Sequence, residues 1–172
     1  MRNFLCLLIA ICLFLFLNGC NTQKKIPVYS TYNEEKNVFV NVGMTKEEID
    51  AILGESTHLG ENSPSYMYFE NDLKNQVVIQ YSAYFTASVI QIHGTNWVVH
   101  DLTCRVNGKI SKLSPKFKSK GDKPGVYYTS YYDAHGTHFD SPYENSVEYR
   151  ISARGENDVI HIIYVGYVSI KS

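Results

Sequence analysis

Two imidazole and two carboxylate side chains fall within the eight residues from Asp133 to Asp140, DAHGTHFD. Histidine and aspartate are ligands of zinc and related metals, so metal chemistry could occur in this stretch. However, the spacing of His135 and His138 points the two rings to opposite faces of a strand, and there is no helical His-Glu-x-x-His motif. A β-hairpin loop rich in Asp, Gly and Ser explains the same residues equally well. We therefore predict no metal and no cofactor, and keep metal binding by this loop as the alternative.

No other pattern in the sequence predicts catalysis. The nucleophile elbow, the phosphate-binding glycine loop and the dinucleotide fingerprint are all absent. Cys6 and Cys12 lie in an N-terminal apolar segment that is predicted to be removed, and Cys20 follows that segment. If Cys20 carries a lipid, only Cys104 remains, so an intramolecular disulfide is excluded, and we expect Cys104 to be a small buried residue. We predict that the protein is not an enzyme and has no small-molecule substrate.

The N-terminus predicts export from the cell. Met1-Arg2-Asn3 is a short basic start, and Phe4 to Leu17 is an unbroken apolar run of the length of a signal peptide. It leads into Leu17-Asn18-Gly19-Cys20, which resembles a bacterial lipobox, although Asn18 departs from the commoner small or aliphatic residue. The resemblance implies a signal peptide over residues 1–19 and a lipid anchor, such as palmitate, on Cys20. An ordinary secretory peptide or an uncleaved anchor is the alternative.

The composition of the chain argues against nucleic acid as a partner. The chain has 172 residues and a formal net charge of −1, which lacks the basic excess that nucleic-acid binding requires. Its 14 tyrosines suit either a binding surface or strands, since aromatic residues favour both. Residues 20–37 are polar with mixed charges, and we predict a lipidated N-terminus and a tether there. The predicted location is therefore the cell membrane or outer membrane, on the extracytoplasmic side.

Residues 42–54 predict one short helix with signals at both ends. Thr45 is placed to cap the N-terminus, and Glu48 completes a capping box three residues later. Gly54 stands where a left-handed C-terminal residue is favoured. The apolar face of this helix is predicted to consist of Ile49, Ile52 and Leu53. Because a helix this short is unstable alone, it must pack on a sheet.

The Gly-Met-Thr start of this helix, its charged pair and its closing Leu-Gly carry a family resemblance. They resemble the signature of the β-lactamase-inhibitor-protein-like domains and of the outer-membrane-assembly lipoproteins of the BamE (SmpA/OmlA) type. In both groups a short helical segment precedes an antiparallel sheet, and the known activity is binding protein. The resemblance implies the same fold and a protein partner for this chain, over about a dozen matching residues.

The strand pattern of the first half returns in the second half. Strands are predicted over residues 66–70, 76–82 and 87–93, and again over residues 126–132, 147–152 and 158–165. Ile110, Leu113 and Phe117 have helical spacing, although Pro115 interrupts that segment. We predict an α+β fold of two tandem units, residues 38–96 and 97–172, each a short helix plus an antiparallel β-sheet. Such tandem units resemble the β-lactamase-inhibitor-protein architecture more than the single-unit BamE type.

Alternation along these strands predicts a binding face. If the helices cover the sheet side formed by Ile90, Ile92, Ile160 and Ile162, the other side presents Gln91, His93, Tyr131 and His161. A mixed apolar and polar surface is typical of interfaces, and a plain solvated sheet face is the alternative. By the family resemblance, loops 71–75 and 133–145 are a second place for partner contacts.

The predicted function is a membrane-anchored, non-catalytic protein-binding module of the cell envelope, either a scaffold or inhibitor-like. The alternatives are the metal-binding protein described above and a structural lipoprotein with no partner. A tight protein partner would distinguish the protein-binding module from both alternatives. Stoichiometric zinc would favour the metal-binding protein.

Overall fold

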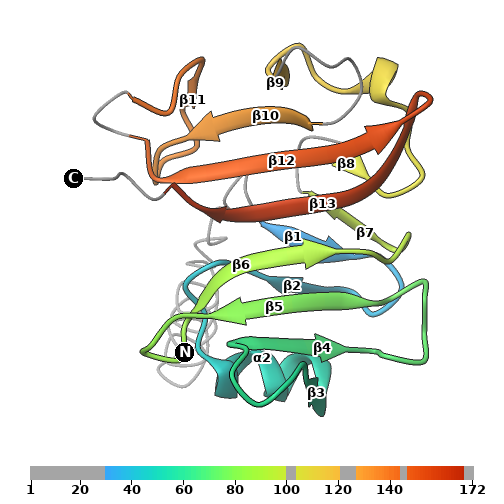
Figure 1. Ribbon diagram of the computed structural model, residues 1–172, viewed down its shortest axis with the longest axis vertical. Helices are drawn as coiled ribbons and strands as arrows, with labels where there is room; N and C mark the ends of the chain where they lie inside the picture. The colour runs from blue at the N-terminus through green and yellow to red at the C-terminus, as the bar shows by residue number, and fades with distance from the viewer. Residues whose placement is uncertain (1–29, 100–103, 121–126, 144–146, 169–172) are drawn as a thin grey trace, which may run out of the picture.

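The computed structural model describes residues 30–99, 104–120, 127–143 and 147–168. The predicted signal peptide and Cys20 lie outside these residues. The described chain is mostly antiparallel β-sheet with one short α-helix, and its strands form two sheets (Figure 1). None of the helices in these ranges is long and apolar enough to cross a bilayer.

The larger sheet is built from both halves of the chain. Its strands are β3 (Ser56–His58), β4 (Ser65–Tyr68), β5 (Val77–Tyr81), β6 (Ala87–Ile92), β9 (Lys118–Lys120), β10 (Tyr127–Tyr132), β11 (His138–Phe139), β12 (Tyr149–Glu156) and β13 (Val159–Tyr167). Their order is β11-β10-β12-β13-β6-β5-β4-β3, and β9 also pairs with β10. The antiparallel contact between β6 and β13 therefore joins the two halves into one sheet.

The smaller sheet lies behind the larger one in Figure 1. It has the order β2-β1-β7-β8, formed by β1 (Thr31–Asn33), β2 (Val38–Val40), β7 (Trp97–Val99) and β8 (Cys104–Arg105). Residues 31–33, which the sequence analysis places in a tether, are thus a strand between β2 and β7. Thr31 and Asn33 are fully buried, and the Thr31 hydroxyl donates a hydrogen bond to the Val40 carbonyl. Alternation alone did not reveal this strand because its buried side chains are polar.

The hydrophobic core fills the space between the two sheets and the helix. The small sheet contributes Val40, Trp97, Val99 and Cys104, the helix contributes Ile49 and Leu53, and the large sheet contributes Val77, Ile79, Ile90, Ile92, Ile151, Ile160, Ile163 and Val165. The prediction that Cys104 is a small buried residue is confirmed, and burial raises the pKa of its thiol to about 12. The larger sheet consequently has one face against this core and one face directed away from it.

The predicted helix is present as α2 (Lys46–Leu53), with its capping box in place. The Glu48 backbone N–H donates to the Thr45 hydroxyl at 3.2 Å, and the Thr45 N–H donates to the Glu48 carboxylate at 2.8 Å. Gly54 ends the helix with a φ of +85°, as its position predicts. Ile49 and Leu53 are buried, but Ile52 is 38% exposed, so the apolar face is narrower than predicted.

The second half has a shorter helical element. In place of an α-helix, residues Ile110–Lys112 form a single 3-10 turn, η1, which has no side-chain cap. Pro115 disfavours helical geometry just before it, so the segment cannot extend. Ile110 and Leu113 nevertheless pack against the core, and Phe117 is buried there.

Each half contains a β-bulge that changes which residues face the core. In the pairing of β5 with β6, the residue between Ala87 and Val89 has no partner in β5. In the pairing of β12 with β13, the register skips His161 of β13, so Ile160 and Ile163 are both buried and Ile162 is not. The prediction that Ile162 faces inward is therefore wrong, because an extra residue shifts the alternation that follows it.

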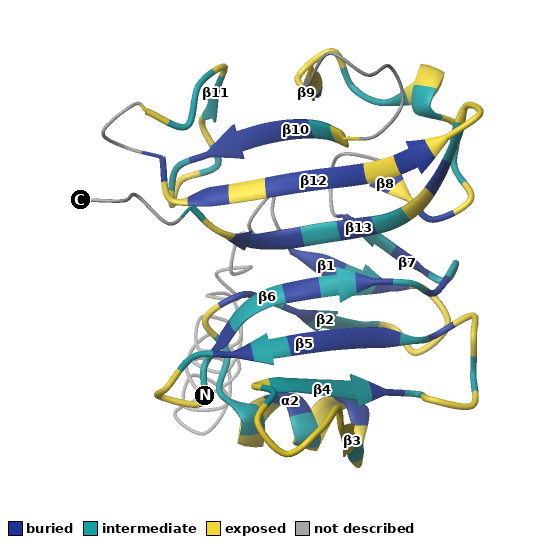
Figure 2. Cartoon of the chain, in the orientation of Figure 1, coloured by how far each residue is buried: buried dark blue, intermediate teal, exposed yellow. Residues whose placement is uncertain are grey.

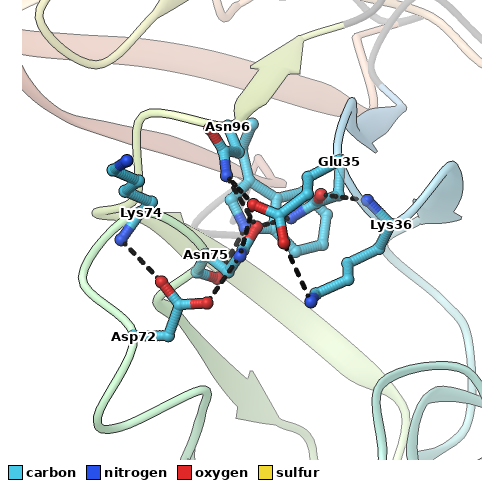
Figure 3. Close-up of polar contacts among 8 residues, drawn as sticks. Glu35, Lys36, Asp72, Lys74, Asn75 and Asn96 are labelled. Carbon is cyan, nitrogen blue, oxygen red and sulfur yellow. Dashed lines mark hydrogen bonds and ion pairs between the residues drawn. The ribbon is translucent and has the colours of Figure 1, made fainter.

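A buried asparagine connects the large sheet to the small one (Figure 3). Asn75, in the turn between β4 and β5, accepts a hydrogen bond from the Asn33 amide at 2.8 Å and donates to Asp72 and Glu35. Its backbone carbonyl accepts the Trp97 indole N–H at 2.7 Å. Three loops far apart in sequence are thus held together by one side chain and its backbone.

Replacing this asparagine tests the network. Asn75→Ala leaves the buried Asn33 amide without its acceptor, so we expect it to lower the free energy of unfolding by about 2–4 kcal/mol. Lys74→Ala is the matched control, because exposed Lys74 enters the network only through its backbone. Urea unfolding of both variants measures the difference, and equal midpoints would show that the network contributes little to stability.

Candidate binding face

The large sheet presents one face to the viewer of Figure 1, opposite the small sheet and α2. Pairing registers and strand alternation place a defined set of residues on this face, which we call the open face. It consists of Thr57, Ser65, Met67, Val78, Gln80, Val89, Gln91, Lys118, Tyr127, Thr129, Tyr131, Phe139, Arg150, Ser152, Arg154, Ile162, Tyr164 and Gly166. No described strand or helix lies over it in this view, and Figure 2 shows exposed segments alternating with buried ones along β12.

Two of the predicted binding residues belong to the open face. Gln91 on β6 is half-buried and lies between Val78 of β5 and Tyr164 of β13. Tyr131 on β10 is 5% exposed and stands opposite Arg150 of β12. Strands β13 and β12 separate Gln91 from Tyr131, so they share a surface without touching.

The two predicted histidines are placed differently from each other. His93 follows β6 directly and continues the alternation of Gln91, and it is half-buried. Burial lowers the pKa of its imidazole below the ordinary value of 6.5, so it is neutral at physiological pH. His161 is exposed and is itself the extra residue of the β13 bulge, so it does not follow the regular alternation of the strand. The four predicted residues therefore do not form a single cluster.

Strand β12 supplies two site residues that the sequence analysis missed. Arg150 and Arg154 are both exposed, four residues apart, with Ser152 between them on the same face. Among the described residues neither guanidinium group forms an ion pair. The signal was present in YRISARGE, where both arginines are exposed and Tyr, Ile, Ser, Ala and Gly are buried. The predicted binding face included no residue of this strand.

A second polar cluster lies beneath α2, on the core side of the sheet. The Tyr68 hydroxyl donates to the Asp50 carboxylate at 2.7 Å and is 2.7 Å from the Tyr81 hydroxyl. Lys46 forms an ion pair with the same carboxylate at 2.6 Å. Burial raises the pKa of both tyrosines, that of Tyr81 to about 12, so neither ionises near neutral pH. This cluster attaches the helix to strands β4 and β5.

The loop proposed as the metal alternative forms a tight turn. The backbone N–H groups of Thr137 and His135 donate to Asp133 at 2.8 Å and hold the pKa of its carboxyl below its usual value. The His138 ring lies 3.1 Å from the Lys116 carbonyl and packs edge-on against Tyr132. The described residues contain no group of three His, Cys, Asp or Glu side chains placed to hold a metal ion.

Other exposed apolar side chains lie on hairpin turns. In loop 71–75 the side chain of Leu73 is 75% exposed, while Asp72 and Asn75 are committed to the buried network. Tyr84 and Phe85 are 88% and 57% exposed at the β5–β6 turn, which the sequence analysis did not single out. Phe85 has a φ of +55°, an uncommon conformation for an aromatic residue.

Comparison with known proteins gives one structural likeness to report. The fold is similar to the crystal structure of a DUF4309 family protein, YjgB, from Bacillus subtilis, with 16% sequence identity and a TM-score of 0.43. The match covers 72% of this chain and 78% of that chain. No protein-family model matches the sequence, and no curated protein matches it.

The environment of His93 predicts a pH dependence of stability. Because its folded pKa is lowered, the unfolded chain binds more protons once the pH falls below about 6.5, and stability decreases with pH in that range. We expect His93→Gln to lose less stability than the native chain between about pH 7.5 and about pH 5.5 in urea unfolding. A slope for His93→Gln identical to that of the native chain would contradict the assignment.

Proposed function

We propose that this protein is a membrane-anchored lipoprotein of the cell envelope and that its open face binds a protein partner without catalysis. The observation that carries the proposal is the composition of the open face. It combines aromatic, apolar, amide and guanidinium side chains on one sheet, and no described element covers it. Tyrosine and arginine are the residues that most often dominate binding energy at protein interfaces.

The open face is rigid because the other side of the same sheet is packed in the core, and rigidity favours binding. Its strands are fixed by ladder hydrogen bonds and by the buried side chains of the opposite face, such as Ile90, Ile151 and Ile163. A surface held in this way loses little conformational entropy when a partner binds. Half-buried Tyr164 and Gln91, side by side on β13 and β6, form its centre.

We further propose that the chain consists of two tandem units related to the β-lactamase-inhibitor-protein-like domains. The order β7, β8, η1, β9, β10, β12, β13 parallels β1, β2, α2, β3, β4, β5, β6, with β11 as an additional strand. Both halves also have a bulge in the last strand, after Ala87 and at His161. The Gly-Met-Thr helix start, whose capping box is formed, is the residue-level feature that supports this relationship.

Substitutions at the centre of the open face test the binding function. We expect full-length protein, solubilised in detergent, to capture one envelope protein, and Tyr164→Ala to weaken that capture about tenfold or more. Tyr84→Ala is the matched control, since Tyr84 is 88% exposed at the β5–β6 turn and is not a residue of the open face. A partner retained equally by both variants would place binding elsewhere, and the absence of any partner would overturn the proposal.

The anchor is tested separately at Cys20. Transfer of a diacylglyceryl group to this thiol, which forms a thioether, predicts that the native chain expressed in bacteria incorporates labelled palmitate in its acyl chains and that Cys20→Ala does not. Cys12→Ala should retain the label, because Cys12 lies within the predicted signal peptide. Label that persists in Cys20→Ala would contradict the lipoprotein assignment.

A further inference from the structure

The open face is not uniform, because its guanidinium groups are both on β12. Arg150 and Arg154 point away from the core on the same face, and strand geometry separates their Cα atoms by about 13 Å. Charged side chains are usually paired or fully solvated, and an exposed pair fixed at this distance on a rigid strand can bind two matched carboxylates.

The residues between the two arginines have short side chains. Ser152 lies between them, and its hydroxyl is 3.2 Å from that of Thr129 on β10. On the other side of β12, Gly166 of β13 pairs with Arg150 and has no side chain. Ser152 and Thr129 are buried, at 7% and 4% exposure, so a partner chain would contact the longer arginine side chains that stand above them.

Aromatic rings flank both arginines. The Arg154 guanidinium carbon lies 5.9 Å from the centre of the Tyr127 ring, within the range of a cation–π contact. Tyr131 is the cross-strand neighbour of Arg150. Contacts of this kind limit the conformations of a guanidinium group, so less entropy is lost when it binds a carboxylate.

We propose that this half of the open face binds an extended acidic segment of a partner protein, with Arg150 and Arg154 each holding one carboxylate. The inference rests on the proposed function and names the chemistry of its partner. In an extended chain, residues i and i+4 lie on the same side and are about 13 Å apart, which matches the spacing of the arginines. A glutamate or aspartate at each of those positions would meet one guanidinium group.

Two glutamates define the limits of the site. Glu148 and Glu156 are exposed just beyond the arginines and follow the same alternation, but neither forms an ion pair with them. A uniformly anionic membrane surface or polymer would be repelled by these carboxylates. Lys118 of β9 pairs with Thr129 and adds a third basic residue to this face, beyond β10. Three basic residues are still fewer than the roughly four to eight that mark adhesion to an anionic membrane. The arrangement thus favours a partner with discrete carboxylates.

The test uses a peptide with two glutamates at the proposed spacing. Thr-Glu-Val-Thr-Val-Glu-Thr, labelled with a fluorophore, should bind the full-length protein in an anisotropy titration, and binding should weaken as salt increases. The control peptide Thr-Glu-Val-Thr-Glu-Val-Thr has the same charge but places its glutamates on opposite sides of an extended chain. We expect it to bind about tenfold more weakly.

Arginine variants connect this binding to the site. Arg150→Gln and Arg154→Gln should each reduce the affinity about tenfold, and Arg150→Lys should lie between native and Arg150→Gln, because lysine lacks the planar fork. Lys112→Gln is the control, since Lys112 belongs to η1, whose neighbours pack on the core side. Thermal unfolding by circular dichroism confirms that each variant is folded.

Each outcome decides between the proposals. Equal affinity for the two peptides, no binding of either, or full affinity in both arginine variants would overturn the acidic-segment proposal. Binding to vesicles of anionic lipid in place of the first peptide would also overturn it and indicate a membrane contact. If Tyr164→Ala abolishes capture of the envelope partner while Arg150→Gln and Arg154→Gln do not, the binding function stands and this inference fails.

Discussion

The pairing of β6 with β13 is the contact on which the rest of the structure depends. It joins strands from opposite halves through four residue pairs, from Val89↔Gly166 to Ile92↔Ile163. On the core side it brings isoleucine and valine side chains together, and on the open side it places Gln91 beside Tyr164. Gly166 allows the two strands to approach closely here, because a Cβ at this position would lie 3.2 Å from a methyl group of Val89 and would displace it. Without this pairing each half would have an uncovered sheet edge.

Features that depend only on residues close together in the sequence were predictable. The helix over 46–53 follows from a capping residue, its glutamate partner and a terminal glycine, all within ten residues. The strands around Val77–Tyr81 and Ala87–Ile92 follow from alternation and turn residues. The burial of Cys104 follows from the usual behaviour of a lone cysteine. These signals act between residues close in sequence, so they can be interpreted without knowing the tertiary structure.

Features that depend on distant partners were not predictable in the same way. Thr31 and Asn33 are buried because β2, β7 and Asn75 satisfy their polar groups, and no pattern in residues 30–37 indicates those partners. The bulge at His161 moves the residues that follow it to the opposite face of the sheet. After that point the observed alternation of β13 differs from the predicted one. Of the predicted binding residues, Gln91 and Tyr131 lie on the side of the sheet away from the core, and their role in binding stays a prediction. Arg150 and Arg154 became evident only when the neighbours of β12 were known.

The position of β1 determines how a mechanical load would enter the fold. The strand pairs with β2 of the first half and with β7 of the second half, and it is where the described chain begins. A force applied through the segment before Ser30 would therefore act first on hydrogen bonds to both halves at once, and not on a peripheral loop. Resistance to such a pull depends on the rate of unfolding, which the buried polar contacts of Thr31 and Asn33 would slow. In a tethered protein, this strand would be the point where tension on the anchor is shared between the two halves.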